Sequence, residues 1–378
     1  MVPRVWVLLG DRPGDNAQLL CLAEALGWPF ETKKLAFNIW QRIPSPMLGA
    51  SRASLDLGAS DPLEPPWPDL VIGCSRKAAP IARWIAACAR ASGTRPRTRL
   101  VHLQHTGGRL DAFDLIITTP QYTLPERSNV LHNSVPLNAI APARLEAAAE
   151  HWRARLDHLP RPWTAVLVGG RNSTYAFDSA AIGGFRAGLI ESAGRHGGSL
   201  LISTSARTQA PVVAMLAELS GMPKLLYRFN PEDPENPYLG YLALADRFIV
   251  TADSASMVAE ACLTGRPVEI FMPSARLSRE DVVKRSAWRG WRAGLIKWGL
   301  VRTPRDFDAY ITALLERGHA RRLGESAEAA SASPLNDMSR SVARVKLLFE
   351  EAPPIGHAAE NSQREQCEET ERRRKWAT

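Results

Sequence analysis

The stretch Arg247-Phe-Ile-Val-Thr-Ala-Asp-Ser254-Ala-Ser256-Met-Val-Ala-Glu260-Ala-Cys-Leu-Thr-Gly265-Arg-Pro267 decides the fold class of this chain. Its apolar start, Arg247–Val250, predicts a short buried strand. Ser254–Leu263 predicts a helix, because a hydroxyl residue precedes it and Gly265 and Pro267 end it. A strand that leads directly into a helix is the repeating unit of parallel α/β sheets.

The start of this helix also predicts an anion-binding site. Backbone N–H groups of a first helical turn have no partner within the helix, and the helix dipole adds positive potential there. Ser254, Ala255 and Ser256 are small enough for a pyrophosphate to approach, and the two serines add hydroxyl donors. Glu260 follows one turn later on the same face and could accept the hydroxyls of a ribose. The alternative is an ordinary N-cap with glutamate as a helix former.

Two more loops are predicted at the same edge of this sheet. Gly169, Gly170, Arg171, Asn172 and Ser173 follow the strand predicted at Trp163–Val168. The glycines allow a tight turn, although the motif is neither a dinucleotide fingerprint nor a P-loop. Arg207 follows the next predicted strand, Ser199–Ser203. Because ligands of open α/β sheets bind at the carboxyl ends of strands, the three loops together favour a nucleotide site over purely structural turns.

Strands and helices alternate in both halves of the chain, which predicts two doubly wound domains facing a cleft. A proline-bounded helix lies where the halves meet. We therefore expect an N-terminal domain at 1–145 and a nucleotide-binding domain at 146–324. An amphipathic helix at 334–350 is expected to cross back to the first domain, and the polar residues 352–378 to form a disordered tail.

Composition excludes several functional classes. The 378 residues include 45% hydrophobic and 23% charged residues, the profile of a globular protein. Five scattered cysteines argue against a disulfide framework or a structural zinc, so no metal is expected. The net charge of +8 reflects either a high arginine content or an anionic ligand or membrane surface. No basic stripe with interleaved aromatics supports nucleic-acid binding. With neither signal peptide nor membrane span, the predicted location is the cytoplasm, with the inner face of the membrane as an alternative.

Candidate bases are found in the first half. Asp11 and Asp15 follow its first strand, and either Asp15 or its neighbour Asn16 could instead cap the next helix. His102 and His105 end a later strand on the same edge; one could be a packed histidine, whereas a histidine facing the cleft would be a second base.

The segment Lys284–Trp298 mixes basic residues with three tryptophans. It is either a packed helix with extended basic side chains or a peripheral contact with a membrane surface.

Several stretches of the chain resemble the mitochondrial-fission Elm family, over roughly residues 4–350. They include GDRPGDNAQLLCLAEALGWPF, DLVIGCSRKAAPIARW, VLVGGRNSTYAFD and the sequence from Asn236 to Phe271. That family looks like a branch of the GT-B glycosyltransferases. The segment Ser254–Pro267 is similar to the donor-binding helix of lipid-linked N-acetylglucosamine transferases, which implies that Glu260 holds the donor ribose. Those enzymes carry Gly-His where this chain has Gly14-Asp15, so the resemblance assigns no base.

The resemblance implies a metal-independent GT-B-type transfer from a nucleotide-diphosphate sugar, with a UDP-sugar favoured and no further cofactor. Helix N-termini with Arg171 or Arg207 would stabilise the departing diphosphate, and Asp15, Asp11 or His105 would take the acceptor's proton. The acceptor is unknown; a lipid-linked or envelope glycan is one option. The alternative is a non-catalytic binding or scaffold protein, in contact with a membrane through Lys284–Trp298.

Overall fold

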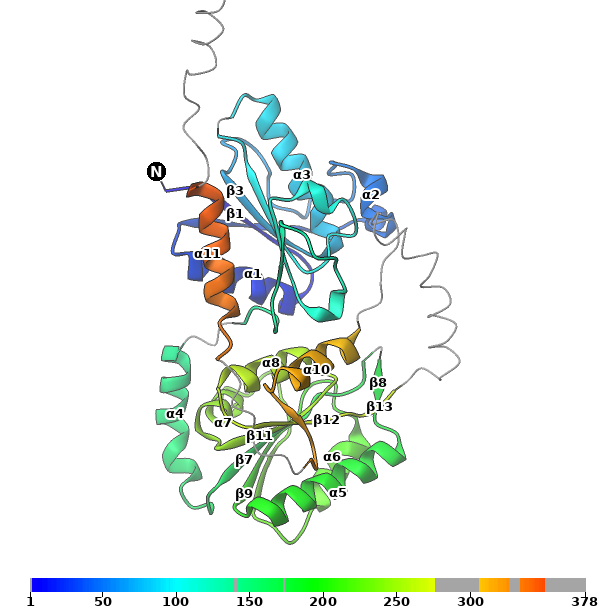
Figure 1. The fold of residues 1–378 in the computed structure, drawn as a ribbon, viewed down its shortest axis with the longest axis vertical. Coiled ribbons are helices and arrows are strands. Elements are labelled where there is room, and N and C mark those ends of the chain that lie inside the picture. The colour runs from blue at the N-terminus through cyan, green and yellow to red at the C-terminus, as the bar shows by residue number, and fades with distance from the viewer. Residues whose placement is uncertain are drawn as a thin grey trace, which may run out of the picture.

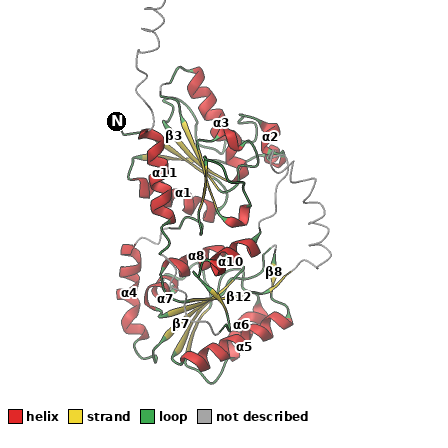
Figure 2. Cartoon of the chain, viewed as in Figure 1, coloured by secondary structure: helices red, strands yellow, loops and turns green. Residues whose placement is uncertain are grey.

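The computed structural model describes residues 2–94, 96–138, 142–172, 174–275, 306–325 and 334–350. These residues form two six-stranded sheets, each parallel throughout, and a two-stranded antiparallel pair. Figures 1 and 2 show each large sheet between helices in its own domain. The predicted α/β fold with two doubly wound, Rossmann-like domains is confirmed. Ser173, the segment Lys284–Trp298 and residues 352–378 lie outside the described ranges.

The first sheet has the strand order β2-β1-β3-β4-β5-β6. Its strands are β1 (Val5–Leu9), β2 (Phe30–Lys34), β3 (Leu70–Cys74), β4 (Arg99–Leu103), β5 (Leu115–Thr118) and β6 (Val130–His132). Helices α1 (Pro13–Leu26) and α3 (Ser75–Ala91) follow β1 and β3, with α2 (Ser45–Leu48) in the connection before β3. Because the order reverses between β1 and β3, the loops after these strands flank the position where such sheets bind ligands.

The second sheet has the order β10-β9-β7-β11-β12-β14. Its strands are β7 (Trp163–Leu167), β9 (Ser199–Ser203), β10 (Lys224–Tyr227), β11 (Arg247–Thr251), β12 (Val268–Phe271) and β14 (Arg321–Arg322). Its helices are α5 (Ser179–His196), α6 (Ala210–Glu218), α7 (Tyr238–Leu244), α8 (Ala255–Leu263) and α10 (Phe307–Glu316). Counted within the domain, this is the Rossmann order 3-2-1-4-5-6, with its reversal between β7 and β11.

Some elements carry no signal that periodicity can detect. Strand β2 has the sequence FETKK, and only Lys33 in it is buried, so this edge strand has no apolar run. The pair β8 (Tyr175–Ala176) and β13 (Ser274–Ala275) and the strand β14 have two residues each, too few to show any period. Helix α1 begins at Pro13, ahead of the cap candidates Asp15 and Asn16, since a proline suits the first helical position.

Two further helices connect the domains. Helix α4 (Pro142–Leu156) packs against α7 of the second domain, where the Trp152 ring occupies the space beside Gly240. Helix α11 (Asp337–Glu350) lies on the first domain against α1 (Figure 1). Val345 is fully buried there, and the rings of Trp28 and Phe349 meet edge to face at 5.2 Å. The end of the described chain thus packs onto the domain that contains its beginning.

Apolar side chains cover both faces of each sheet, as parallel strands require. Within the described ranges, no helix has the length and apolar character needed to cross a membrane.

Candidate functional site

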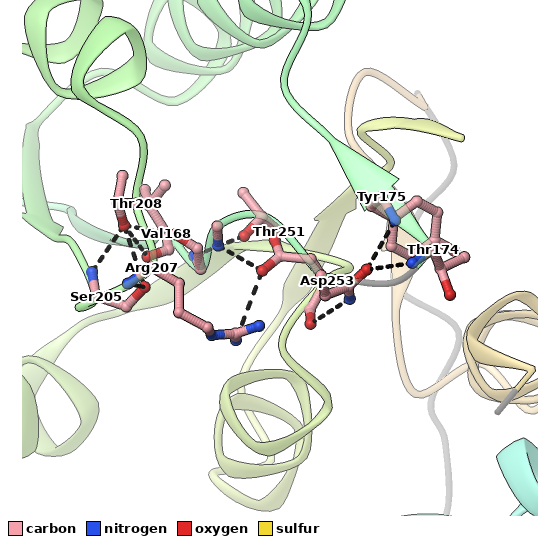
Figure 3. A network of polar contacts seen from close by, with 11 residues as sticks. Val168, Thr174, Tyr175, Ser205, Arg207, Thr208, Thr251 and Asp253 are labelled. Carbon is pink, nitrogen blue, oxygen red and sulfur yellow. Dashed lines mark hydrogen bonds and ion pairs between the residues drawn. The ribbon is translucent and has the colours of Figure 1, made fainter. Parts of the chain in front are cut away.

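Three loops meet at the carboxyl edge of the second sheet, at its reversal between β7 and β11. They are the loop after β7, the loop after β9 and the short link from β11 to α8 (Figure 3). Their common neighbour is Asp253, which lies between the strand end at Thr251 and the helix start at Ser254.

The Asp253 side chain is fully buried under the turn after β7. Its Oδ2 accepts a hydrogen bond of 2.5 Å from the Gly170 N–H and lies 3.7 Å from Nη2 of Arg207. Its Oδ1 is buried and has no hydrogen-bond partner within the described residues. Burial raises the pKa of this carboxyl, and the hydrogen bonds with the Gly170 N–H and the Thr251 side chain and the charge of Arg207 only partly oppose the shift. The site therefore contains a buried carboxyl group whose loss of solvation is only partly offset by hydrogen bonds and a nearby positive charge.

The two glycines are required by packing within the site. A Cβ on Gly169 would lie 2.1 Å from Oδ2 of Asp253, and a Cβ on Gly170 would lie 1.9 Å from the Arg207 carbonyl oxygen. Their N–H groups are also engaged, because that of Gly169 donates to Thr251 Oγ1 at 2.8 Å and that of Gly170 to Asp253. The turn thus joins the three loops and directs these amides inward.

The other residues of this turn differ in their contacts: Asn172 is hydrogen-bonded within the loop, whereas Arg171 is exposed to solvent. Asn172 accepts hydrogen bonds from the N–H groups of Thr174 and Tyr175, both at 2.7 Å, and donates to the Asp253 carbonyl at 2.9 Å. Its side chain therefore shapes the loop, an Asx turn. The Arg171 side chain is exposed, and Ser173 lies outside the described residues.

The amides available to an anion are at the start of α8. Ser254 is the N-cap residue, but its hydroxyl makes no capping hydrogen bond. Helical geometry leaves the N–H groups of Ala255, Ser256 and Met257 without an intrahelical partner. Ser256 is exposed and Ser254 is nearly buried. With the half-exposed Arg207 opposite, this end of α8 combines amides, a hydroxyl and a guanidinium.

Glu260 lies further along α8 and contacts the connection from the first domain. Its Oε1 accepts a 2.6 Å hydrogen bond from Asn138 Nδ2, and its Oε2 accepts one from the Tyr238 hydroxyl of α7. Burial raises the pKa of Glu260, and these two hydrogen bonds oppose the shift. The carboxylate that was predicted to hold a ribose thus already holds two protein donors.

The acidic candidates of the first domain lie after β1. Asp15 is in the first turn of α1, where Arg12 is the N-cap and no side chain caps the helix. Its Oδ1 accepts a 2.8 Å hydrogen bond from Gln104 Nε2, at the end of β4. Asp11 pairs with Lys77 at 2.6 Å, and this hydrogen bond lowers the pKa of Asp11. Asn16 instead clamps the loop, bonding both the N–H and the carbonyl of Gly10.

The two histidines after β4 differ in environment. His102 is fully buried against Phe113, its Nε2 is 3.0 Å from the Ser75 carbonyl, and desolvation lowers its pKa to about 3. It is therefore the packed, neutral histidine. His105 is partly exposed, and its Nδ1 accepts a 2.7 Å hydrogen bond from the Gly107 N–H, which leaves the proton of the neutral ring on Nε2.

A small pocket brings Asp11 and Asp15 together, and His105 is not in its lining. Its lining includes Asp11, Asp15, Phe37 and Ser75. Ser75 and Gln104, at the ends of adjacent strands, both have a left-handed backbone, with φ of 67° and 69°. Non-glycine residues adopt this conformation at a cost of order 1–3 kcal/mol and are often found at functional sites. Within the described ranges, no three His, Cys, Asp or Glu side chains are grouped to hold a metal.

Sequence reasoning missed three residues of the second-domain site: Asp253, Asn138 and Tyr238. Asp253 had a detectable signal, since an acidic residue directly between a buried strand and a helix start belongs to the binding edge by position alone. Asn138 and Tyr238 had none, because each reaches Glu260 from a distant part of the chain.

Two Rossmann-like domains, each with polar loops at its strand reversal, define a GT-B-like protein. The chain belongs to the mitochondrial fission ELM1 family, whose model matches residues 13–348. It is 28% identical over 305 residues to the mitochondrial fission protein ELM1 of Arabidopsis thaliana, covering 74% of this chain and 63% of that protein. The chain thus spans less than two thirds of the length of the plant relative.

A second relative is an uncharacterised protein of Rickettsia prowazekii, 24% identical over 302 residues, with 71% of this chain and 83% of that protein covered. Among solved structures, the chain is similar to the UDP-GlcNAc 2-epimerase of Neisseria meningitidis bound to UDP-GlcNAc. The TM-score is 0.44 at 13% identity, with 92% of this chain and all of that chain covered.

Proposed function

We propose that the chain is a GT-B-type glycosyltransferase that uses a nucleoside-diphosphate sugar, with UDP as the favoured nucleotide. In this proposal residues 146–324 bind the donor and residues 1–145 the acceptor. The observation that carries it is the convergence of three loops around Asp253 at the strand reversal of a Rossmann-ordered sheet. A cytoplasmic location is part of the proposal.

The diphosphate would lie at the start of α8. There the unpaired amides of Ala255 and Ser256, the Ser256 hydroxyl and the helix dipole favour negative charge. Arg207 is close enough to Asp253 to be held at the rim and is half exposed, so its guanidinium can move onto a phosphate oxygen. Arg171 is exposed on the adjoining turn and supplies a second cation. These groups would stabilise the departing diphosphate.

Asp253 would orient this arrangement without touching the donor. Its bond to Gly170 fixes the turn after β7, and its charge attracts Arg207 toward the rim. A bound diphosphate would compete with Asp253 for Arg207, since both are anionic. Asp253 would thus hold Arg207 near the site before the donor binds, and part of this attraction would be lost when Arg207 turns to the phosphate.

The acceptor's proton would go to Asp15, the first-domain candidate that is partly buried and not ion-paired. Asp11 is a weaker base, because its bond to Lys77 lowers its pKa. His105 is the remaining alternative, although its Nδ1 already accepts a hydrogen bond from Gly107. Ser75, with its left-handed backbone, lines the same pocket, and Gln104, also left-handed, bonds Asp15 from the end of β4.

Isothermal calorimetry with UDP and UDP-sugars tests the donor site directly. Wild type is expected to bind, and Glu260→Ala to bind more weakly by about 1–3 kcal/mol through lost charge-assisted hydrogen bonds. Ile190→Ala is the matched control, since that side chain is exposed on α5, away from the three loops. Absence of nucleotide binding by folded wild type would refute the proposal and leave the non-catalytic scaffold. Binding without any turnover would support a GT-B-like binding protein.

A further inference from the structure

The buried carboxyl group of Asp253 has one counter-charge, and that charge is on a side chain that is able to turn away. The Asp253 side chain is fully buried, whereas the Arg207 side chain is 47% exposed, and 3.7 Å separates Oδ2 of Asp253 from Nη2 of Arg207. Figure 3 shows the guanidinium reaching toward Asp253 from the loop after β9. Among the described residues, Arg207 is the only ion-pair partner of this carboxyl group. The compensation of a buried charge therefore depends on a half-exposed side chain.

Asp253 cannot follow Arg207 outward. Its Oδ2 accepts the Gly170 N–H at 2.5 Å, and the backbone of Gly169 packs so closely that an added Cβ would lie 2.1 Å from the same oxygen. Arg207, by contrast, has much of its side chain in solvent. An anion at the start of α8 would attract this guanidinium. The ion pair would then lengthen, because only one of its partners can move.

The other charged groups near Asp253 do not replace Arg207. Arg171, on the turn after β7, is exposed and makes no ion pair with Asp253; in the proposed function it also turns to the phosphate. The charged side chain of α8 is Glu260, an acid whose two oxygens already accept hydrogen bonds from neutral side chains. Next to a bound diphosphate, Asp253 would therefore have no counter-charge among the described residues.

The neutral form of Asp253 fits the site without rearrangement. Oδ1 is buried and has no hydrogen-bond partner within the described residues, so a proton on this oxygen breaks no hydrogen bond. Oδ2 would become the carbonyl oxygen of the acid and would still accept the Gly170 N–H. Burial already raises the pKa of this carboxyl in the protein without ligand. The departure of Arg207 and the arrival of a diphosphate would raise the pKa of Asp253 further, because both disfavour a negative charge there.

We propose that the nucleotide-sugar donor binds together with a proton, which Asp253 takes up from the solvent as Arg207 turns to the diphosphate. This step rests on the donor site of the proposed function. The proton adds to Oδ1 and converts the carboxylate to the neutral acid, and no bond of the donor changes. Because the complex holds this proton more tightly than the protein alone, donor affinity falls as pH rises through the interval between the two pKa values of Asp253. The donor site thus binds most tightly at acidic pH.

Isothermal calorimetry of the full-length protein with UDP-GlcNAc tests the linkage. Both phosphates of this nucleotide sugar are esterified, so its charge is constant between the ordinary pKa of a carboxyl group and neutrality. In buffers of different ionisation enthalpy, the observed heat reports the number of protons taken up. We expect wild type to take up a fraction of a proton that approaches one. Donor affinity should fall by up to about tenfold per pH unit, the limit for one linked proton.

Three variants assign the proton to its site. Asp253→Asn keeps an acceptor for the Gly170 N–H but cannot ionise, so donor binding should take up no proton and should not vary with pH. Arg207→Ala removes the counter-charge in advance, so Asp253 is neutral over more of the pH range before the donor binds and the uptake should fall. Glu260→Gln is the matched control, because Glu260 also has a raised pKa but lies at the proposed ribose position. It should bind the donor more weakly and retain the proton uptake.

The outcomes separate this linkage from the donor site itself. Folded wild type that binds no UDP-GlcNAc at any pH would refute the donor site and the linkage together. Binding that takes up no proton throughout the range would overturn the linkage and leave the donor site standing. Uptake that persists in Asp253→Asn, or that is unchanged in Arg207→Ala, would also overturn it, since another group would then titrate. Melting curves establish that each variant folds; if Asp253→Asn does not, Arg207→Ala decides, because only a half-exposed side chain is removed there.

Discussion

Asn138, on the connection that leaves the first domain, donates a 2.6 Å hydrogen bond to Oε1 of Glu260 in the second domain. The same carboxylate accepts the Tyr238 hydroxyl on its other oxygen, and burial raises its pKa. The residue proposed to hold a ribose is therefore the residue through which the connection contacts α8. A nucleotide at this position would have to share or replace the amide of Asn138.

This relationship predicts that Asn138→Ala binds UDP about ten- to a hundredfold more tightly than wild type, since a hydrogen bond to a charged group is worth about 1.5–3 kcal/mol. Calorimetry beside Glu260→Ala measures the effect. Ser134→Ala is a matched control. Ser134 lies on the same connection, and its hydroxyl accepts a hydrogen bond from Arg317 without contacting Glu260. Weaker binding by Asn138→Ala would mean that the amide assists the nucleotide instead of competing with it.

A second prediction concerns the turn after β7. Gly170→Ala should destabilise the second domain by about 1–3 kcal/mol or more, because the added methyl group would meet backbone atoms that cannot rotate away. Gly183→Ala is the matched control on α5, where an added Cβ has no neighbour within 4 Å. That change should stabilise the helix by roughly 0.5–1 kcal/mol. Thermal melting compares the two, and equal melting temperatures would show that the loops do not pack as described.

A third prediction concerns pH. The pKa of Asp253 is raised above its ordinary value of 3.8 by burial, so the folded protein holds this proton more tightly than the unfolded chain does. The stability that this group contributes is fully present below the pKa of the unfolded chain, and it is lost as pH rises through the folded pKa. Asp253→Asn keeps an acceptor for the Gly170 N–H and cannot ionise. Its melting temperature relative to wild type should therefore increase as pH rises from acid toward neutrality.

A difference in melting temperature that does not change with pH would contradict this assignment. Glu260 has a raised pKa as well, but it remains in both proteins, so its titration cancels in the comparison. The matched substitution Asp246→Asn, at an exposed ion pair with Arg161, should show no such increase.

The sequence was most informative where structure is local. The run from Arg247 to Leu263 predicted a strand, a helix and their junction, because the apolar strand and the helix-ending Gly265 lie within one short segment. It did not predict what the two glycines after β7 do. Their amides bond Thr251 and Asp253, which are more than eighty residues away, and no periodicity encodes that pairing. Polar edge strands such as β2 were missed for a related reason, since hydrogen bonds to a neighbour define them more than burial does.

The last prediction concerns Asp15, for which the sequence leaves two roles open, a general base or a helix cap. Arg12 is the N-cap of α1, so Asp15 does not cap this helix. Capping was the alternative to a role for Asp15 as a base. Asp15→Asn should keep the hydrogen bond from Gln104, because the asparagine carbonyl accepts as the carboxylate does. Only the interaction of a negative charge with the helix dipole is lost, about 0.3–1 kcal/mol. Folding and UDP affinity should therefore be nearly unchanged.

Turnover should fall by roughly 10²–10⁴-fold, the usual contribution of a general base, because an amide cannot accept the acceptor's proton. Hydrolysis of the donor sugar provides the assay until an acceptor is known. Asp11→Asn is the matched control: it removes a neighbouring carboxylate that is ion-paired with Lys77 and more exposed, so its effect on turnover should be small. If Asp11→Asn abolishes turnover and Asp15→Asn does not, the base is Asp11. If neither does, His105 remains, and His105→Gln decides the assignment.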